Sequence, residues 1–314
     1  LPPLYDRRFP DRPDDLHWGE LFPRRHAQLC IREKQGHSQE RKSSLPCMIF
    51  GDYTTFATHT FIYRSHMQTA DSIVIIPTYN EKENIENIIR AVFGLEKEFH
   101  ILVIEDGSPD GTAAIVRRLQ GEFPERLFMI ERKGKLGLGT AYITGFKWAI
   151  EHRYDYIFEM DADFSHNPND LPRLYDACAK EGYDVAIGSR YISGVNVVNW
   201  PMGRVLMSYF ASKYVRFVTG LKIHDTTAGF KCYRREVLET IPLDHIRFKG
   251  YAFQIEMKFT AYKCGANVKE VPVIFINREL GTSKMNSSIF GEAVFGVIRL
   301  KWDSWFHKYP NLKD

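Results

Sequence analysis

Two aspartates, Asp161 and Asp163, stand two positions apart and directly follow a mainly apolar run at residues 156–160. In an extended segment the side chains of residues i and i+2 point to the same side, so both carboxylates can face one cation. Such oxygen ligands suit Mg²⁺ or Mn²⁺, which take further ligands from water and substrate phosphates. A divalent ion of this kind neutralises the charge on a departing diphosphate. An isolated Asp-x-Asp pair is more often an exposed loop, so the surrounding elements decide between the two interpretations.

Short apolar runs alternate with segments of helical spacing from residue 72 onward. We expect strands at 72–77, 100–105, 127–131 and 156–160, and helices at 84–93, around 115–119 and at 141–151. This alternation predicts an α/β fold in which helices flank a mostly parallel sheet. Ligands on such sheets bind beyond the carboxyl ends of the strands. Three polar motifs follow strands there, namely Pro77-Thr78-Tyr79-Asn80-Glu81, Glu105-Asp106-Gly107-Ser108 and Asp161-Ala162-Asp163.

The first two motifs carry residues that suit a nucleoside. Asp106 has a type common in turns and helix N-caps, but its carboxylate can also accept hydrogen bonds from a base or ribose. Tyr79 can stack on the same base, and Glu81 can accept a hydrogen bond from it. Because the ends of neighbouring parallel strands meet at one edge, we expect the three residues to line one crevice.

The order of these motifs resembles family 2 glycosyltransferases, and within them the dolichol- or polyprenol-phosphate mannose synthases. The resemblance covers roughly residues 70 to 300, and several motifs in one order make chance a poor explanation. It rests on the segments 77–81, 105–112, 137–141, 160–166, 188–191, 225–231, 249–257 and 270–273.

This resemblance implies a GT-A (Rossmann-like) fold in a single catalytic domain with one continuous sheet. It implies an inverting, metal-dependent transfer of mannose from GDP-mannose to a dolichyl or polyprenyl phosphate, giving a β-linked mannosyl phospholipid. One alternative is the same chemistry with another donor, such as UDP-glucose. Another is a nucleotide-sugar-binding protein without catalytic activity, against which the intact Asp161/Asp163 pair argues.

The resemblance also implies roles for individual residues. Ribose, diphosphate and Mg²⁺ or Mn²⁺ are assigned to the Asp161-Ala162-Asp163 segment. The family's third metal ligand, often Gln, corresponds to Ser165, whose hydroxyl is a weaker ligand, so water is expected to complete the shell. Guanosine contacts are expected from Pro77, Tyr79, Glu81, Ile104 and Asp106, and basic contacts to the diphosphate and sugar from Arg190, Arg278 and Lys284.

A phosphate acceptor has different needs from a hydroxyl acceptor. A hydroxyl needs a general base, whereas a phosphate monoester already carries about −1.5 to −2 charges and needs cations to hold it. Arg204 and Ser208 lie one turn apart on a predicted helix and, with Arg190, match positions attributed to acceptor-phosphate binding. An ordinary helix surface is the alternative for this pair. Asp225 is expected at the rim of the site, or as a base if the acceptor were a hydroxyl.

The first 66 residues differ in composition from the rest. They are rich in proline and arginine and show no persistent period through residue 24. We expect residues 1–66 to be a leader, either disordered or upstream of a natural start at Met67, and residues 67–314 to form the catalytic domain. A genuine N-terminal subdomain is the alternative.

The composition of the chain limits the kinds of partner and the compartment that we expect for the protein. A formal net charge of +3 gives no argument for nucleic acid, and five cysteines without CxxC spacing fit a reducing compartment. No apolar run approaches the roughly 18–20 residues needed to span a bilayer. Residues 205–218 and 289–306 mix aromatic, aliphatic and basic side chains, as helices lying in a membrane interface do, although packing on the core is the alternative. We therefore expect a peripheral protein on the cytoplasmic face of a membrane, with or without an anchoring partner.

Overall fold

The computed structural model describes residues 70–250, 252–277 and 288–314, and for 288–293 the backbone only. The predicted leader and two predicted site residues, Arg278 and Lys284, lie outside the described residues.

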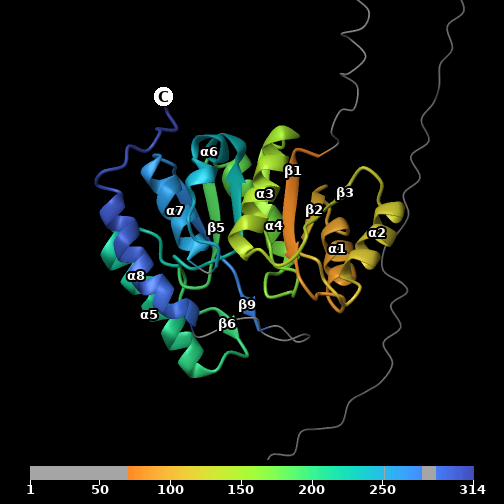
Figure 1. The fold of residues 1–314 in the computed structure, drawn as a ribbon, viewed down its shortest axis with the longest axis horizontal. Helices are drawn as coiled ribbons and strands as arrows, with labels where there is room; N and C mark the ends of the chain where they lie inside the picture. Colours follow the sequence, from red (N-terminus) through yellow and green to blue (C-terminus); the bar gives the residue numbers. More distant parts are fainter. Residues whose placement is uncertain (1–69, 251, 278–287) are drawn as a thin grey trace, which may run out of the picture. The chain divides into compact units, whose positions relative to one another are not determined.

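The described part is built on a seven-stranded sheet with the order β3-β2-β1-β4-β7-β5-β8 (Figure 1). All neighbouring strands are parallel except that β7 runs antiparallel to both β4 and β5. The predicted mostly parallel sheet is thus confirmed. Its strands are β1 (Ser72–Thr78), β2 (His100–Glu105), β3 (Leu127–Glu131), β4 (Tyr156–Glu159), β5 (Val185–Ser189), β7 (Lys231–Arg234) and β8 (Val268–Pro272).

Helices cover both faces of this sheet, so a central strand such as β2 is buried at every position. One face packs against α1 (Ile85–Phe93), α2 (Thr112–Glu122) and α4 (Leu171–Ala179). The other packs against α3 (Leu138–Glu151), α6 (Arg235–Thr240) and α7 (Phe253–Lys263). Two longer helices, α5 (Met202–Thr219) and α8 (Ser288–Asp303), lie side by side beyond α7 (Figure 1).

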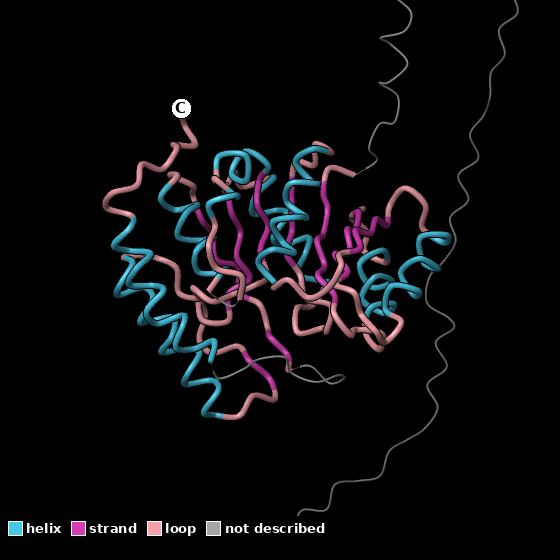
Figure 2. The backbone as a smooth tube through the Cα atoms, in the orientation of Figure 1, coloured by secondary structure: helices cyan, strands magenta, loops and turns pink. Residues whose placement is uncertain are grey.

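The remaining elements are short. β6 (Val197–Val198) and β9 (Phe275–Ile276) form a parallel two-stranded sheet, visible as the short magenta segments below the main sheet in Figure 2. Short 3-10 turns occur at Pro168–Asp170 and Leu243–His245. No helix in the described part of the chain is long and apolar enough to cross a membrane.

Most predicted boundaries agree with the structure to within a residue, but α3 begins earlier than predicted, at Leu138. Gly139 explains the difference. Its N–H donates to the carbonyl of Lys249 at 2.9 Å, and a Cβ atom there would lie 2.6 Å from the carbonyl oxygen of Phe248. The glycine that weakens the helical pattern in the sequence is therefore what lets the first turn of α3 pack closely on the next segment.

Candidate active site

The polar motifs that follow β1 and β2 are tied together by hydrogen bonds. The N–H of Asn80 donates to Oγ of Ser108 at 3.0 Å, and the N–H of Glu81 donates to Oγ1 of Thr112 at 3.0 Å. Since β1 also pairs with β4, the segment that begins at Asp161 lies at the same edge. The predicted meeting of the three motifs at the carboxyl ends of the strands is observed.

The Asp161–His166 turn is held by its own side chains. The N–H of Asp161 donates to Nδ1 of His166 at 3.1 Å, and Oδ1 of Asp163 accepts from the N–H and the hydroxyl of Ser165 at 3.1 and 2.6 Å. The hydroxyl of Tyr142, from α3, lies 3.4 Å from Oδ1 of Asp161. The Asp161 side chain is 39% exposed, whereas Asp163 is buried. One carboxylate therefore faces solvent and the other is fixed by the turn.

His166 fixes this turn as a neutral imidazole. Burial lowers the pKa of His166 to about 4. Because Nδ1 accepts a hydrogen bond from a backbone N–H, the ring proton is on Nε2. The ring stacks on Phe230 at 4.9 Å and meets the edge of Phe275 at 5.4 Å. The sequence placed His166 in a motif but assigned it no role.

Asp161, Asp163 and Ser165 fit a divalent ion that is bound through few protein atoms. Among the described residues, no group of three His, Cys, Asp or Glu side chains could hold a metal ion by itself. Asp161 and Asp163 supply carboxylate oxygens, and the Ser165 oxygen lies beside Asp163 while its proton is donated to that carboxylate. Mg²⁺ sites of this type use one or two carboxylates together with substrate phosphates and water.

Asp106 has a partner that the sequence analysis missed. Nε and Nη2 of Arg132 donate to Oδ1 and Oδ2 of Asp106 at 2.6 and 2.8 Å, and both side chains are about nine-tenths buried. Nη1 of Arg132 donates to Oγ1 of Thr140 at 2.9 Å, near the start of α3. The register of β2 with β3 pairs Glu105 with Glu131, which brings the next residue of each strand together. Pairing the ends of consecutive strands could therefore have identified Arg132.

Of the other residues predicted to contact guanosine, two are partly exposed and two are buried. Pro77 and Tyr79 are partly exposed, and Nζ of Lys135 lies 5.2 Å from the centre of the Tyr79 ring. Glu81 is buried and accepts a hydrogen bond from Nδ2 of Asn84 at 3.0 Å. Ile104 is fully buried in the core, so its side chain is not at the surface where a base could contact it. Ala162 is buried as well, between the two aspartates.

Arg190 and Asp225 form a buried ion pair. Nε and Nη2 of Arg190 each lie 2.7 Å from a different oxygen of Asp225, and Nη2 also donates to Oγ1 of Thr227 at 2.7 Å. The expectation that Asp225 lies at the rim is wrong, because this residue is fully buried. Burial alone would raise the pKa of Asp225, but Arg190 holds that pKa below its ordinary value. A carboxylate so engaged is poorly suited to act as a general base.

The two arginines predicted to bind the acceptor lie near one aromatic ring. Cζ of Arg204 lies 4.0 Å from the centre of the Trp200 ring, and Cζ of Arg190 lies 5.5 Å from it. Nη1 of Arg204 donates to Oδ1 of Asn277 at 2.9 Å. Oγ of Ser208, one turn further along α5, is buried without a hydrogen-bond partner in the described structure. No role was predicted for Trp200, whose ring lies beside both basic groups.

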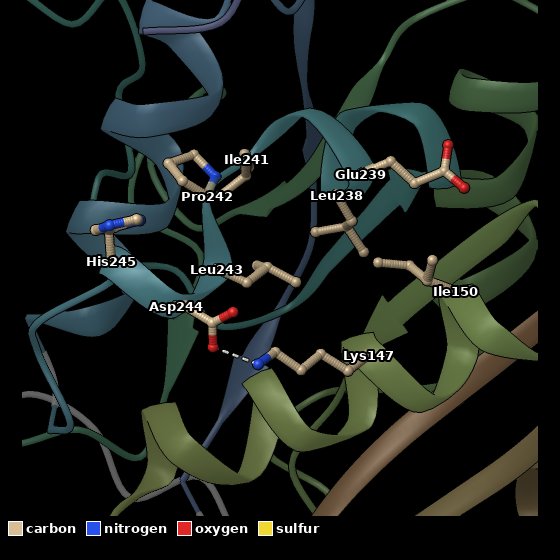
Figure 3. A pocket seen from close by; sticks show the side chains of 9 residues that line it. All are labelled: Lys147, Ile150, Leu238, Glu239, Ile241, Pro242, Leu243, Asp244 and His245. Atoms are coloured by element: carbon tan, nitrogen blue, oxygen red, sulfur yellow. Dashed lines mark hydrogen bonds and ion pairs between the residues drawn. The ribbon is translucent and has the colours of Figure 1, made fainter. Parts of the chain in front are cut away.

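A separate hollow lies between α3 and the segment formed by α6 and the following 3-10 turn (Figure 3). Apolar side chains such as Ile150, Leu238 and Leu243 line it, and Lys147 and Asp244 form an ion pair at its edge. Its lining residues are not those that the sequence predicted for the site.

Comparison with known proteins gives one family and several relatives. Residues 73–242 match the model of glycosyl transferase family 2. The polyprenol monophosphomannose synthase of Mycolicibacterium smegmatis is 49% identical over 229 residues, which cover 73% of this chain and 86% of that protein. The undecaprenyl-phosphate mannosyltransferase of Micrococcus luteus is 44% identical over 227 residues, covering 72% and 92% of the two chains.

Among solved structures, glucosyl-3-phosphoglycerate synthase from Mycobacterium tuberculosis, in complex with Mn²⁺, UDP and glucosyl-3-phosphoglycerate, is similar in fold. The TM-score is 0.54 at 17% identity, and the match covers 74% of this chain and 79% of that one. At this identity the likeness concerns the fold alone, and it agrees with the GT-A fold that the sequence implied.

Proposed function

This chain belongs to glycosyl transferase family 2, and from that premise we propose that it transfers mannose from GDP-mannose to a polyprenyl or dolichyl phosphate. The two curated relatives, at 49% and 44% identity over most of their lengths, carry names that describe this reaction class. The structural observation that best supports the proposal is a chain of ring contacts. It leads from His166 in the Asp161–His166 turn through Phe275 to Trp200, which lies beside Arg190 and Arg204.

In this proposal each group has one task. Asp161 and Asp163 would hold Mg²⁺ or Mn²⁺ beside the diphosphate end of the donor, and Ser165 fixes the Asp163 carboxylate. What the bound ion supplies is neutralisation of the charge that develops on the leaving diphosphate. Arg190, held by Asp225, and Arg204, held by Trp200, provide positive charge for the acceptor phosphate.

The reaction then needs no general base. An oxygen of the acceptor phosphate attacks the anomeric carbon from the side opposite the diphosphate, the bond from that carbon to the GDP oxygen breaks, and a β-linked mannosyl phosphate forms. The attacking oxygen carries no proton that must be removed, since the monoester is already ionised near neutral pH. The burial of Asp225 against Arg190 agrees with this scheme, because it leaves that carboxylate to orient Arg190.

A panel of donors tests the proposed function. The purified protein is incubated with Mn²⁺, polyprenyl phosphate and, separately, radiolabelled GDP-mannose, UDP-glucose or UDP-GlcNAc. We expect labelled lipid from GDP-mannose only. Labelled lipid from UDP-glucose would favour the alternative donor, and no lipid product from any donor would favour a binding protein without catalytic activity.

Arg204 tests the acceptor half of the proposal. Replacing Arg204 by alanine removes a charged hydrogen-bonding group worth about 1.5–3 kcal/mol, so we expect the KM for polyprenyl phosphate to rise by roughly 10- to 100-fold while the KM for GDP-mannose changes little. Arg118→Ala, at an exposed arginine of α2, away from α5 and α8, is the matched control. An equal rise in both KM values would reject the assignment of Arg204 to the acceptor.

We also propose that α5 and α8 place the protein on a membrane surface. α8 buries Val297 and Leu300 against the domain, but α5, α8 and the turn after α8 expose large apolar side chains on the same part of the molecule. Exposed apolar groups of this extent mark interaction surfaces, and their mixture with basic residues suits an interface between water and lipid. These exposed side chains are Met202, Leu206, Met207, Phe210, Phe217, Phe295, Ile298, Trp302, Trp305 and Phe306.

Serine substitutions in α8 and the turn after it test the membrane surface. Full burial of one large apolar side chain stabilises by about 1.5–3 kcal/mol, so the Trp302→Ser/Trp305→Ser double variant should lose at least about tenfold in binding to anionic phospholipid vesicles. Co-sedimentation measures the binding. A water-soluble, short-chain acceptor serves as the control, since its turnover should stay unchanged. Vesicle binding equal to that of the unmodified protein would contradict the proposal.

A further inference from the structure

Three polar side chains form a buried cluster at the end of β4, next to the Asp161–His166 turn. Nζ of Lys231, on β7, lies 3.1 Å from Oε1 of Glu159, the last residue of β4. Nε2 of Gln254, on α7, donates to Oε2 of Glu159 at 2.7 Å, and its Oε1 accepts from Nζ of Lys231. Glu159 and Lys231 are completely buried, and Gln254 nearly so. We refer to these three residues as the buried triad.

Stability alone is a poor reason to keep such a cluster. Removing two charges from water costs free energy that their attraction in the interior often fails to recover. Apolar residues of similar volume in place of a buried ion pair are frequently neutral or stabilising. The buried triad therefore calls for another role.

The position of the buried triad suggests that role. Glu159 stands two residues before Asp161, so both side chains leave the chain on the same side, toward α3 and α7. Gln254 also approaches the far end of the turn. A Cβ atom at Gly229 would lie 3.5 Å from Cε1 of His166 and 3.6 Å from Nε2 of Gln254, so both side chains lie next to the backbone at Gly229.

We propose that Glu159, Lys231 and Gln254 are positioning residues that hold the end of β4, and so fix Asp161 and Asp163 for the metal-bound diphosphate. Each member comes from a different element, β4, β7 or α7, so the buried triad joins the end of β4 to β7 and α7. This inference rests on the proposed function, because it takes the two aspartates as the metal ligands. Mutation of groups that orient metal ligands commonly lowers metal affinity by about 10- to 100-fold.

A triple variant, Glu159→Met/Lys231→Met/Gln254→Met, tests the proposal because it keeps the volume of the cluster and removes its hydrogen bonds and charges. Mn²⁺ binding in the presence of GDP is followed by electron paramagnetic resonance and calorimetry, and stability by thermal unfolding. We expect a melting temperature within a few degrees of that of the unmodified protein, together with a Kd for Mn²⁺ raised by about 10- to 100-fold. If the triple variant does not fold, the single variant Gln254→Met is tested instead, with the same measurements of Mn²⁺ binding and thermal unfolding.

Tyr154→Phe is the matched control. Tyr154 is equally buried, and its hydroxyl bonds Nδ1 of His100 at 2.6 Å at the opposite end of the strands. This variant should lower the melting temperature and leave Mn²⁺ binding unchanged. A folded triple or Gln254→Met variant that binds Mn²⁺ and GDP normally would overturn the positioning role, as would an equal loss of binding in Tyr154→Phe. An unmodified protein that binds no Mn²⁺ with GDP would instead refute the proposed function.

Discussion

Replacing Asp163 by asparagine should lower kcat/KM for mannosyl transfer by at least about 100-fold without unfolding the protein. Groups that merely orient metal ligands already account for about 10- to 100-fold, so loss of a ligand's charge should cost more. The fold should tolerate the change, because an asparagine oxygen can accept the same two hydrogen bonds from Ser165 that Oδ1 of Asp163 now accepts. Initial rates at saturating Mn²⁺, with a thermal unfolding curve for each protein, measure both effects.

Ser165→Ala separates the metal site from the turn. It removes the hydroxyl but keeps the backbone N–H that donates to Asp163. If Ser165 acts mainly by fixing Asp163, the variant should lose only a few-fold in activity, in line with a net hydrogen bond of about 0.5–1.5 kcal/mol. Loss as large as that of Asp163→Asn would indicate a direct Ser165 ligand. An active Asp163→Asn enzyme would contradict the assignment of Asp163 as a metal ligand.

The sequence predicted the parallel part of the fold because the signals there are local. β2 and β3 have the predicted bounds, since apolar runs that end in polar turns mark buried strands without reference to the rest of the chain. β7 was not predicted. Its first residue is Lys231, a charge that local reasoning places at the surface, and only its distant partner Glu159 makes burial of that charge tolerable.

In the site, too, local signals could be predicted from the sequence and contacts between distant residues could not. The motifs identified Asp106, Asp225 and Arg190, but they did not identify Arg132 or Glu159 and could not tell which side chains would pair. Asp106 with Arg132, Arg190 with Asp225 and Glu159 with Lys231 meet only through strand register and the antiparallel insertion of β7. Asp225 was therefore expected at the rim, whereas it lies in the interior.

Replacing Arg190 by methionine should destabilise the protein and abolish transfer together. Breaking a buried ion pair by removing one partner typically costs about 3–5 kcal/mol, since it leaves the other charge buried without compensation. For a domain of this size that corresponds to a fall of roughly 6–20 °C in melting temperature. In the unmodified protein the backbone N–H of residue 190 donates to Asp225 at 3.0 Å. The Arg190→Met/Asp225→Asn variant removes both charges but keeps a side-chain oxygen at position 225 that can accept this hydrogen bond. It should regain much of the stability and none of the activity.

The effect of pH on Arg190→Met gives an independent test. In the unmodified protein the pKa of Asp225 lies below its unfolded value of about 3.9, so the stability it contributes is present above that pH and is lost as the pH falls through the folded pKa. Without Arg190, burial raises the folded pKa of Asp225 above 3.9, and stability is instead lost as the pH rises. The deficit of Arg190→Met should therefore be largest near neutral pH and shrink toward pH 4. A deficit independent of pH would mean that Asp225 is not the charge left behind, and that Arg190 stabilises the fold through Thr227 and its aromatic neighbours alone.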